Sequence, residues 1–205
     1  MSDEKLYISY NFIHKLCQET AVKIREDGKP DVIVAIGGGG FIPARILRSF
    51  IKLPGEKNIP IQAIGLSLYE DMGNGEDSIG KEVIRTQWLD FGALSQHFDS
   101  LIGKNVLIID EVDDTRTTLH YAVSELYKDV KEMAEKLGRQ DETTKFNIFV
   151  LHNKNKPKRA EIDFKMLGGG QYYAARDVPD AWIAYPWEAV DIDEHQRQAE
   201  RQGFV

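Results

Sequence analysis

Residues 106–118 bring together an apolar segment, four carboxylates and a run of hydroxyl groups. The apolar residues 106–109 are followed by an acidic cluster, which consists of Asp110, Glu111, Asp113 and Asp114. Because carboxylates this close repel one another, the cluster needs a bound cation or exposure to solvent. The hydroxyl turn, residues 115–118, comes next at the expected start of a helix, where amides and hydroxyls bind anions. The order predicts a sugar phosphate as ligand, with hydroxyls or Mg²⁺ at the acids and the phosphate at the turn.

A second group with chemical potential is the glycine loop, residues 37–40, where four glycines precede a helical pattern that Pro43 opens. Glycines at such a junction let backbone amides approach a charged oxygen closely. The loop lacks the Lys-Ser/Thr pair of a nucleotide-binding P-loop, and it is a poor match to the dinucleotide fingerprint. Taken alone, each group also fits a structural role: a tight turn for the glycines, and a solvated strand end for the acids.

These groups need a scaffold that brings several strand ends to one edge. Apolar runs alternate with amphipathic patterns, which is typical of an α/β fold with a mainly parallel, twisted sheet flanked by helices. We expect strands at residues 31–36, 59–69, 83–88, 106–109 and 146–151, and helices at 10–24, 43–51 and 118–137. Ligands bind at the carboxyl ends of the strands in such sheets. Residues 1–152 are expected to form the core, and residues 153–205, here called the hood, a small lobe of the same domain.

The composition of the chain limits the binding partners and the compartment that can be expected. The chain has 205 residues and a net charge of −7, which argues against nucleic acid and anionic membranes. Its single cysteine, Cys17, allows no internal disulfide and fits a reducing compartment. Residues 1–11 contain no apolar run typical of a signal peptide, and no segment has the ~20 apolar residues of a membrane helix. We therefore expect a cytoplasmic protein.

Residues 109–115, Ile-Asp-Glu-Val-Asp-Asp-Thr, resemble the motif that binds phosphoribosyl diphosphate (PRPP) in type I phosphoribosyltransferases, and most closely that of the fungal 6-oxopurine enzymes. The similarity extends from Tyr7 to Trp187. It implies transfer of the phosphoribosyl group from PRPP to xanthine, guanine or hypoxanthine, with release of pyrophosphate, Mg²⁺ as cofactor and a homodimer as the assembly. It also implies that Asp110 and Glu111 bind the ribose hydroxyls and that Asp114 exchanges a proton with purine N7 as a catalytic residue.

The resemblance assigns a larger set of residues to PRPP and the metal. The PRPP set is Gly38, Gly39, Gly40, Arg45, Asp110, Glu111, Asp113, Thr115, Arg116, Thr117 and Thr118, in which residues 115–118 hold the 5′-phosphate. The implied metal ligands are Asp110, Glu111 and Glu188. Two positions depart from the family pattern, because Arg116 stands where many relatives carry glycine and Gly38 where they carry a basic residue. The pyrophosphate then needs another cation, and the candidates are Arg45, Lys81, Arg85 and Mg²⁺.

Residues 66–71 are similar to the start of the catalytic loop that closes over PRPP in the family. This similarity makes Tyr69 a second catalytic candidate, although Leu68 stands directly before it where the family has serine. The glycine-bearing residues 70–80 that follow are either a mobile loop over the site or a hairpin tip.

In the hood, residues 180–188 are similar to the segment that recognises the base. The resemblance implies that Trp182 stacks on the purine and that the backbone at Ile183 faces its 2-position. Lys154 matches the lysine that donates to purine O6, and Lys156 is close enough to be the one that does so. Residues 154–159 are rich in basic side chains, which is also typical of a solvated turn.

Two other functions remain as alternatives. A phosphotransferase of the Asp-x-Asp kind needs a second acid two residues after Asp110, but that position is Val112. A non-catalytic regulator that senses purines or PRPP on the same fold is expected to lose base-binding or catalytic residues, and this chain retains Asp114, Tyr69 and Trp182. The preferred purine stays open, with residues 59–65 and 80–85 more similar to the xanthine branch.

Overall fold

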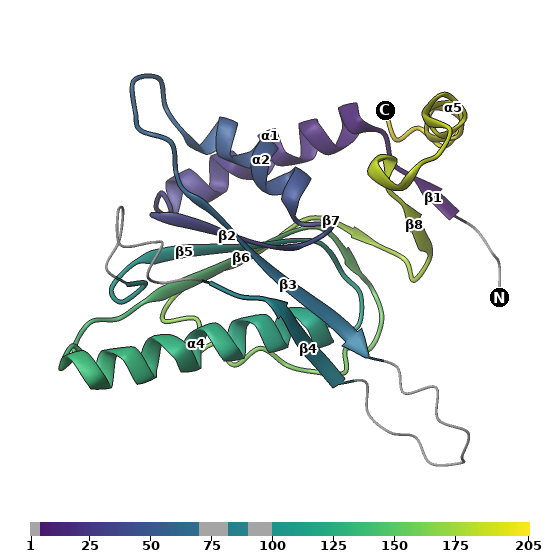
Figure 1. Ribbon diagram of the computed structural model, residues 1–205. Coiled ribbons are helices and arrows are strands. Elements are labelled where there is room, and N and C mark those ends of the chain that lie inside the picture. The colour runs from purple at the N-terminus through teal and green to yellow at the C-terminus, as the bar shows by residue number, and fades with distance from the viewer. Residues whose placement is uncertain (1–4, 70–81, 90–99) are drawn as a thin grey trace, which may run out of the picture.

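The computed structural model describes residues 5–69, 82–89 and 100–205 (Figure 1). Its centre is a six-stranded sheet with the strand order β4-β3-β2-β5-β6-β7. The strands are β2 (Val32–Gly37), β3 (Ile61–Tyr69), β4 (Glu82–Gln87), β5 (Asn105–Asp113), β6 (Lys145–Lys154) and β7 (Tyr172–Val178). All neighbours are parallel except β3 and β4, which are antiparallel. The expected α/β fold with a mainly parallel sheet is confirmed.

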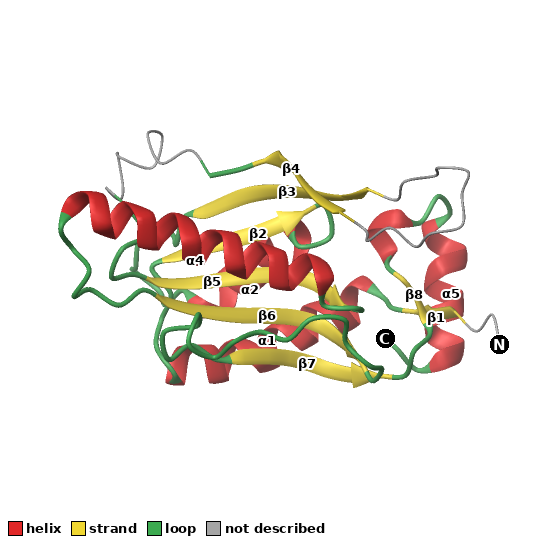
Figure 2. Cartoon of the chain, turned by 90° about the horizontal axis from the view of Figure 1, so that it is seen from below, coloured by secondary structure: helices red, strands yellow, loops and turns green. Residues whose placement is uncertain are grey.

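Helices cover both faces of this sheet. Helices α1 (Tyr10–Glu26) and α2 (Phe41–Ile51) lie on one face, and α4 (Thr117–Leu137) lies along the other (Figures 1 and 2). Alternate residues of β5 supply two hydrophobic cores: Leu107 and Ile109 on the α1–α2 side, Val106 and Ile108 on the α4 side. A parallel strand buried on both faces is a continuous apolar run, which is why the sequence predicted this strand.

Helix α1 shows how local sequence sets an element. It begins after Ser9, whose Oγ accepts a hydrogen bond from the N–H of Phe12 at 3.0 Å, as N-cap serines do.

Cys17 is buried in this helix, and burial raises the pKa of its thiol to about 12, so the residue is inert core, as expected. No helix in the described parts of the chain is both long and apolar enough to cross a bilayer.

Strands β5 and β6 are longer than their apolar runs. The parallel ladder continues past the apolar residues and pairs Val112 with His152 and Asp113 with Asn153. The first three acids of the acidic cluster therefore lie on β5 itself, rather than in a turn after it, and Lys154 is the last residue of β6. Backbone pairing thus fixes the position of side chains that the sequence placed beyond the strand ends.

The expected boundary at residue 152 does not coincide with the layers of the structure. Strand β7 belongs to the main sheet, because Tyr173, Ala175 and Val178 pack into the core. Strand β1 (Lys5–Tyr7), from the other end of the chain, pairs with β8 (Trp182–Ala184) to form a second, two-stranded sheet. Helix α5 (Ile192–Gln202) packs against β1, and the N–H of Tyr7 donates to Gln202 Oε1 at 2.8 Å. The lobe beside the main sheet is therefore built from both ends of the chain.

Candidate active site

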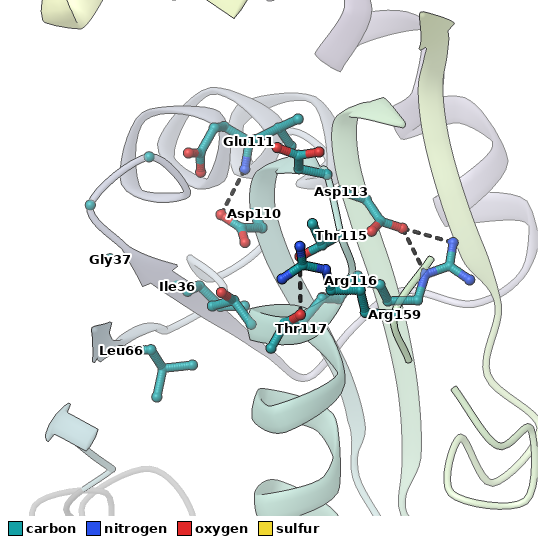
Figure 3. A pocket seen from close by; sticks show the side chains of 16 residues that line it. Ile36, Gly37, Leu66, Asp110, Glu111, Asp113, Thr115, Arg116, Thr117 and Arg159 are labelled. Carbon is teal, nitrogen blue, oxygen red and sulfur yellow. Dashed lines mark hydrogen bonds and ion pairs between the residues drawn. The ribbon is translucent and has the colours of Figure 1, made fainter. Parts of the chain in front are cut away.

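The described residues form a cavity of about 360 Å³ at the carboxyl ends of β2 and β5, beside the start of α4 (Figure 3). Its volume is in the range of small-molecule sites. It is lined by Ile36, Gly37, Gly38, Gly39, Leu66, residues 110–119 and Arg159. The glycine loop, the acidic cluster and the hydroxyl turn thus meet in one cavity, as the sequence predicted.

The glycines of the glycine loop have different surroundings. Gly38 is exposed, and a Cβ placed on it would meet no atom within 4 Å. Gly39 lies so close to the Glu111 carboxylate that a Cβ would displace it. Gly40 does not line the cavity: its N–H donates to the carbonyl of Ile36 at 2.9 Å, and a Cβ would lie 2.5–2.6 Å from carbonyl oxygens of β2 and β5. Contrary to expectation, Gly40 offers no free amide to a phosphate; it lets α2 begin close against the sheet.

Asp110 and Glu111 form an acidic pair at the end of β5. Asp110 is buried, and its Oδ1 accepts a hydrogen bond from the N–H of Glu111 at 2.9 Å. Burial, followed by the negative charge of Glu111, raises the pKa of Asp110 well above its ordinary value. A carboxyl group in this position gains from a cation or from hydroxyl donors, which both favour its ionised form.

This pair fits a magnesium ion that is carried by a phosphorylated substrate. In proteins Mg²⁺ is held by one or two carboxylates, while substrate oxygens and water complete its coordination. Among the residues that the structure describes, no three acids, histidines or cysteines are placed to hold a metal by themselves. Glu188 lies in the 3₁₀ turn Pro186–Glu188 and does not line the cavity, whereas the other two expected metal ligands, Asp110 and Glu111, do.

Arg116 departs from its expected role at the phosphate. Its φ of 68° is left-handed, a conformation that no other non-glycine residue adopts in the described part of the chain, and this explains why glycine suits the position. Its Nε and Nη2 donate to Asp113 Oδ2 at 2.9 and 2.8 Å, as the dashed lines in Figure 3 show. The Tyr172 hydroxyl donates to the same oxygen at 2.7 Å, and the Tyr172 ring centre lies 5.3 Å from the guanidinium. The Arg116 guanidinium therefore neutralises buried Asp113 instead of facing a ligand.

Asp114, the expected proton acceptor, lies beside two lysines of the hood. Lys156 Nζ is 2.8 Å from its Oδ1, and Lys154 Nζ is 3.2 Å from its Oδ2. Asp180 lies 2.9 and 3.9 Å from the same two ammonium groups. Partial burial raises the pKa of Asp114, but the hydrogen bonds from Lys156 and Lys154 outweigh this effect, so the pKa is below its ordinary value. The carboxylate is therefore ionised at neutral pH, and both lysines expected at the purine are next to it.

Trp182 and Ile183 occupy different environments on β8. The Trp182 side chain is 66% exposed, so it is available to stack on a flat ring rather than buried in a core. Ile183 is buried, which leaves only its backbone to face a ligand.

Tyr185 connects this part of the hood to the acidic pair. Its hydroxyl donates to the backbone carbonyl of Glu111 at 3.1 Å and lies 2.8 Å from His152 Nδ1. Because the hydroxyl hydrogen points to the carbonyl, Nδ1 of His152 must donate the second bond. Burial lowers the pKa of His152 to about 4, so this histidine is neutral near pH 7.

Several candidate residues are not brought into the cavity. Arg45, on α2, donates to Ser49 Oγ at 2.7 Å and does not line the cavity. Arg85, on β4, forms ion pairs with acids of α4. Tyr69 is the last residue of β3, but its side chain and Lys81 lie outside the described residues. Both arginines thus have partners away from the glycine loop in this structure.

Three residues that the structure places at or near this site were not among the candidates predicted from the sequence. Arg159 lines the cavity, and its N–H donates to the carbonyl of Thr115 at 3.0 Å. Tyr172 and Tyr185 orient Asp113 and Glu111 through the hydrogen bonds given above. Arg159 belonged to a basic run that was typical of a solvated turn, and the tyrosines belonged to an aromatic segment without a metal or nucleophile pattern.

Comparison with known proteins gives consistent results along the whole chain. Residues 9–161 match the family model described as "Phosphoribosyl transferase domain". The chain is 65% identical to "Xanthine phosphoribosyltransferase 1" of Saccharomyces cerevisiae, with 98% of each chain covered. It is 58% identical to the hypoxanthine-guanine phosphoribosyltransferase of Schizosaccharomyces pombe, over 99% of this chain and 98% of that one.

Solved structures show the same fold. A hypothetical protein from Neisseria gonorrhoeae with bound ppGpp has a TM-score of 0.76 and 38% identity, covering 98% of this chain and 99% of that one. A purine phosphoribosyltransferase from Pyrococcus horikoshii has a TM-score of 0.62 and 26% identity, covering 93% and 97%. With this fold, this cavity and these relatives, the chain belongs to the phosphoribosyl transferase domain family.

Proposed function

We propose that this chain is a purine salvage enzyme that transfers the phosphoribosyl group from PRPP to a 6-oxopurine, forming the nucleoside monophosphate and pyrophosphate. The observation that carries the proposal is the cavity in which the acidic cluster, the glycine loop and the hydroxyl turn meet. Identities of 65%, 58% and 54% to enzymes named for xanthine or hypoxanthine and guanine support the choice of substrate.

The part of the site that binds PRPP is proposed as follows. Amides and hydroxyls of the hydroxyl turn bind the 5′-phosphate at the start of α4, where the helix dipole favours an anion. The amides of Gly38 and Gly39 face the pyrophosphate, and Asp110 and Glu111 bind the ribose hydroxyls. Mg²⁺, bound with PRPP beside these two carboxylates, would neutralise charge that develops on the leaving pyrophosphate.

The part that handles the base centres on Asp114. As N9 of the purine bonds to ribose C1, N7 becomes more acidic, and the ionised Asp114 accepts its proton. Lys154 or Lys156 donates to the O6 oxygen, which holds the base in the orientation that this transfer needs. Trp182 offers its exposed face to the purine ring.

We further propose xanthine as the preferred base. The relative named for xanthine is 65% identical, against 58% and 54% for those named for hypoxanthine and guanine. A competition assay with the three bases at equal concentration tests this choice. Faster consumption of guanine or hypoxanthine would contradict it.

The experiment that tests the proposed reaction is pyrophosphate release from PRPP and Mg²⁺ in the presence of each base. Turnover that needs both PRPP and a base is expected. PRPP binding without turnover on any of the three bases would instead support the non-catalytic regulator, for which the relatives give no support. A cytoplasmic homodimer is proposed from the family resemblance, and light scattering of the purified chain tests its mass.

A further inference from the structure

The cavity has fewer available cations than its ligand requires. Four carboxylates line it, and the basic residues among its lining are Arg116 and Arg159. The Arg116 guanidinium is committed to Asp113 Oδ2 by two short hydrogen bonds. PRPP carries negative phosphate groups at both ends. Mg²⁺ beside the acidic pair would neutralise charge only at the pyrophosphate end. The 5′-phosphate end thus has one remaining candidate for a cation in the described lining.

That candidate, Arg159, has an exposed side chain. Within residues 5–69, 82–89 and 100–205, its guanidinium makes no hydrogen bond or ion pair, whereas the other arginine of the cavity is paired. A guanidinium carries five N–H donors in a planar fork that matches two oxygens of a phosphate. An unpaired fork at the wall of a cavity is therefore free to bind an anion.

The backbone around Arg159 is fixed to the phosphate end of the cavity. The N–H of Arg159 donates to the carbonyl of Thr115, in the hydroxyl turn, at 3.0 Å. The preceding Lys158 donates its three ammonium hydrogens to three backbone carbonyls, those of Asp113 at 2.7 Å, Lys154 at 2.9 Å and Asp114 at 3.0 Å. These bonds join the ends of β5 and β6 to the segment that carries Arg159. The backbone that carries the guanidinium is thus held beside the hydroxyl turn by hydrogen bonds.

We propose that Arg159 binds the 5′-phosphate of PRPP and of the nucleoside monophosphate product. The inference rests on the proposed function for the identity of the ligand, but its chemistry is that of any sugar 5-phosphate. Thr115 and Thr117, whose hydroxyl oxygens are 3.0 Å apart, supply the neutral donors of the same subsite. Arg159 thereby provides the cation that Arg116 is unable to give.

The test compares Arg159→Gln and Arg159→Lys with Arg201→Gln, a matched change of an exposed arginine near the end of α5. Affinities for guanosine 5′-monophosphate, guanosine, ribose 5-phosphate and magnesium pyrophosphate are measured by calorimetry, and the KM for PRPP by initial rates. Arg159→Gln should weaken both 5′-phosphorylated ligands and raise the KM for PRPP about 10- to 100-fold, the value of a lost charge-assisted phosphate contact. Guanosine and pyrophosphate should bind as before, and Arg159→Lys should recover part of the loss.

Several results would overturn the inference. Unchanged affinity for ribose 5-phosphate in Arg159→Gln is one, and an equal loss for guanosine, which has no phosphate, is another. A loss confined to magnesium pyrophosphate would assign Arg159 to the opposite end of PRPP. If the wild-type chain released no pyrophosphate with any base, the proposed function would fail, while the ribose 5-phosphate titrations would still decide the role of Arg159.

Discussion

Replacing Arg116 separates two effects that the structure combines in one residue. Arg116 holds a left-handed φ of 68°, and it also pairs with Asp113, whose side chain is 0% exposed. Breaking a buried ion pair costs about 3–5 kcal/mol, and the 22% exposure of Arg116 puts the expected loss for Arg116→Ala at the low end, about 3 kcal/mol. Arg116→Gly loses the same contacts but removes left-handed strain of about 1–2 kcal/mol, part of which is offset by the greater backbone entropy of unfolded glycine.

Arg116→Gly should therefore unfold at a higher urea concentration than Arg116→Ala. The expected difference in the free energy of unfolding is about 1 kcal/mol. For a domain of this size that difference is about 2–4 °C in Tm. The measurement is urea unfolding of both variants at one protein concentration, and Asp113→Ala with the double variant Asp113→Ala/Arg116→Ala completes a cycle for the pair. Equal stability of the glycine and alanine variants would refute the argument from strain. A coupling energy near zero would refute the ion pair.

Four further predictions concern the active site and the glycine loop. Asp114→Asn should reduce kcat about 100-fold with the KM for PRPP nearly unchanged, and wild-type turnover would remove Asp114 from proton transfer. The pKa of Asp114 is lower in the folded chain than in the unfolded chain. The ionised carboxylate therefore stabilises the fold fully above its unfolded pKa, which is near 4, and this stabilisation is lost as the pH falls through the folded pKa. Measuring Tm as the pH is lowered, with Asp114→Asn as control, tests this. Trp182→Ala should weaken purine binding by about 1–3 kcal/mol without a change in Tm, and an unchanged KM for purine would contradict stacking. Gly40→Ala should lower Tm because its Cβ meets two carbonyl oxygens, whereas Gly38→Ala should not; equal Tm values would contradict the packing described.

The scaffold was predictable because its central strands are buried on both faces. Such strands are unbroken apolar runs, and the stripe of α4 has a clear helical period. The sequence did not predict that β7 joins the main sheet or that β1 pairs with β8. Strand β7, at a sheet edge, has no unbroken apolar run and includes two successive exposed residues, and β1 is only three residues long, so neither gives a strong local pattern.

The site was predictable where it is local in sequence. The acidic cluster and the hydroxyl turn are consecutive, so one strand and one helix start were enough to place them together. The direction of the Arg116 guanidinium was not predictable from the sequence. It depends on Tyr172, which lies on β7 and donates a hydrogen bond to Asp113. Arg159 was missed for the same reason, since its place in the cavity lining and its bond to the Thr115 carbonyl depend on a contact between residues far apart in the sequence.

The pairing of β1 with β8 has a consequence for the order of events during synthesis. Residues 5–7 leave the ribosome long before their partners, residues 182–184, have been synthesised. The main sheet through β6 has all its strands much earlier, and contacts between distant residues form late because closing a long loop costs entropy. A nascent chain should therefore complete the cavity proposed for PRPP before β8, which carries Trp182, the residue proposed to stack on the purine. Ribosome-bound chains halted before β8 would bind the sugar phosphate but not the base.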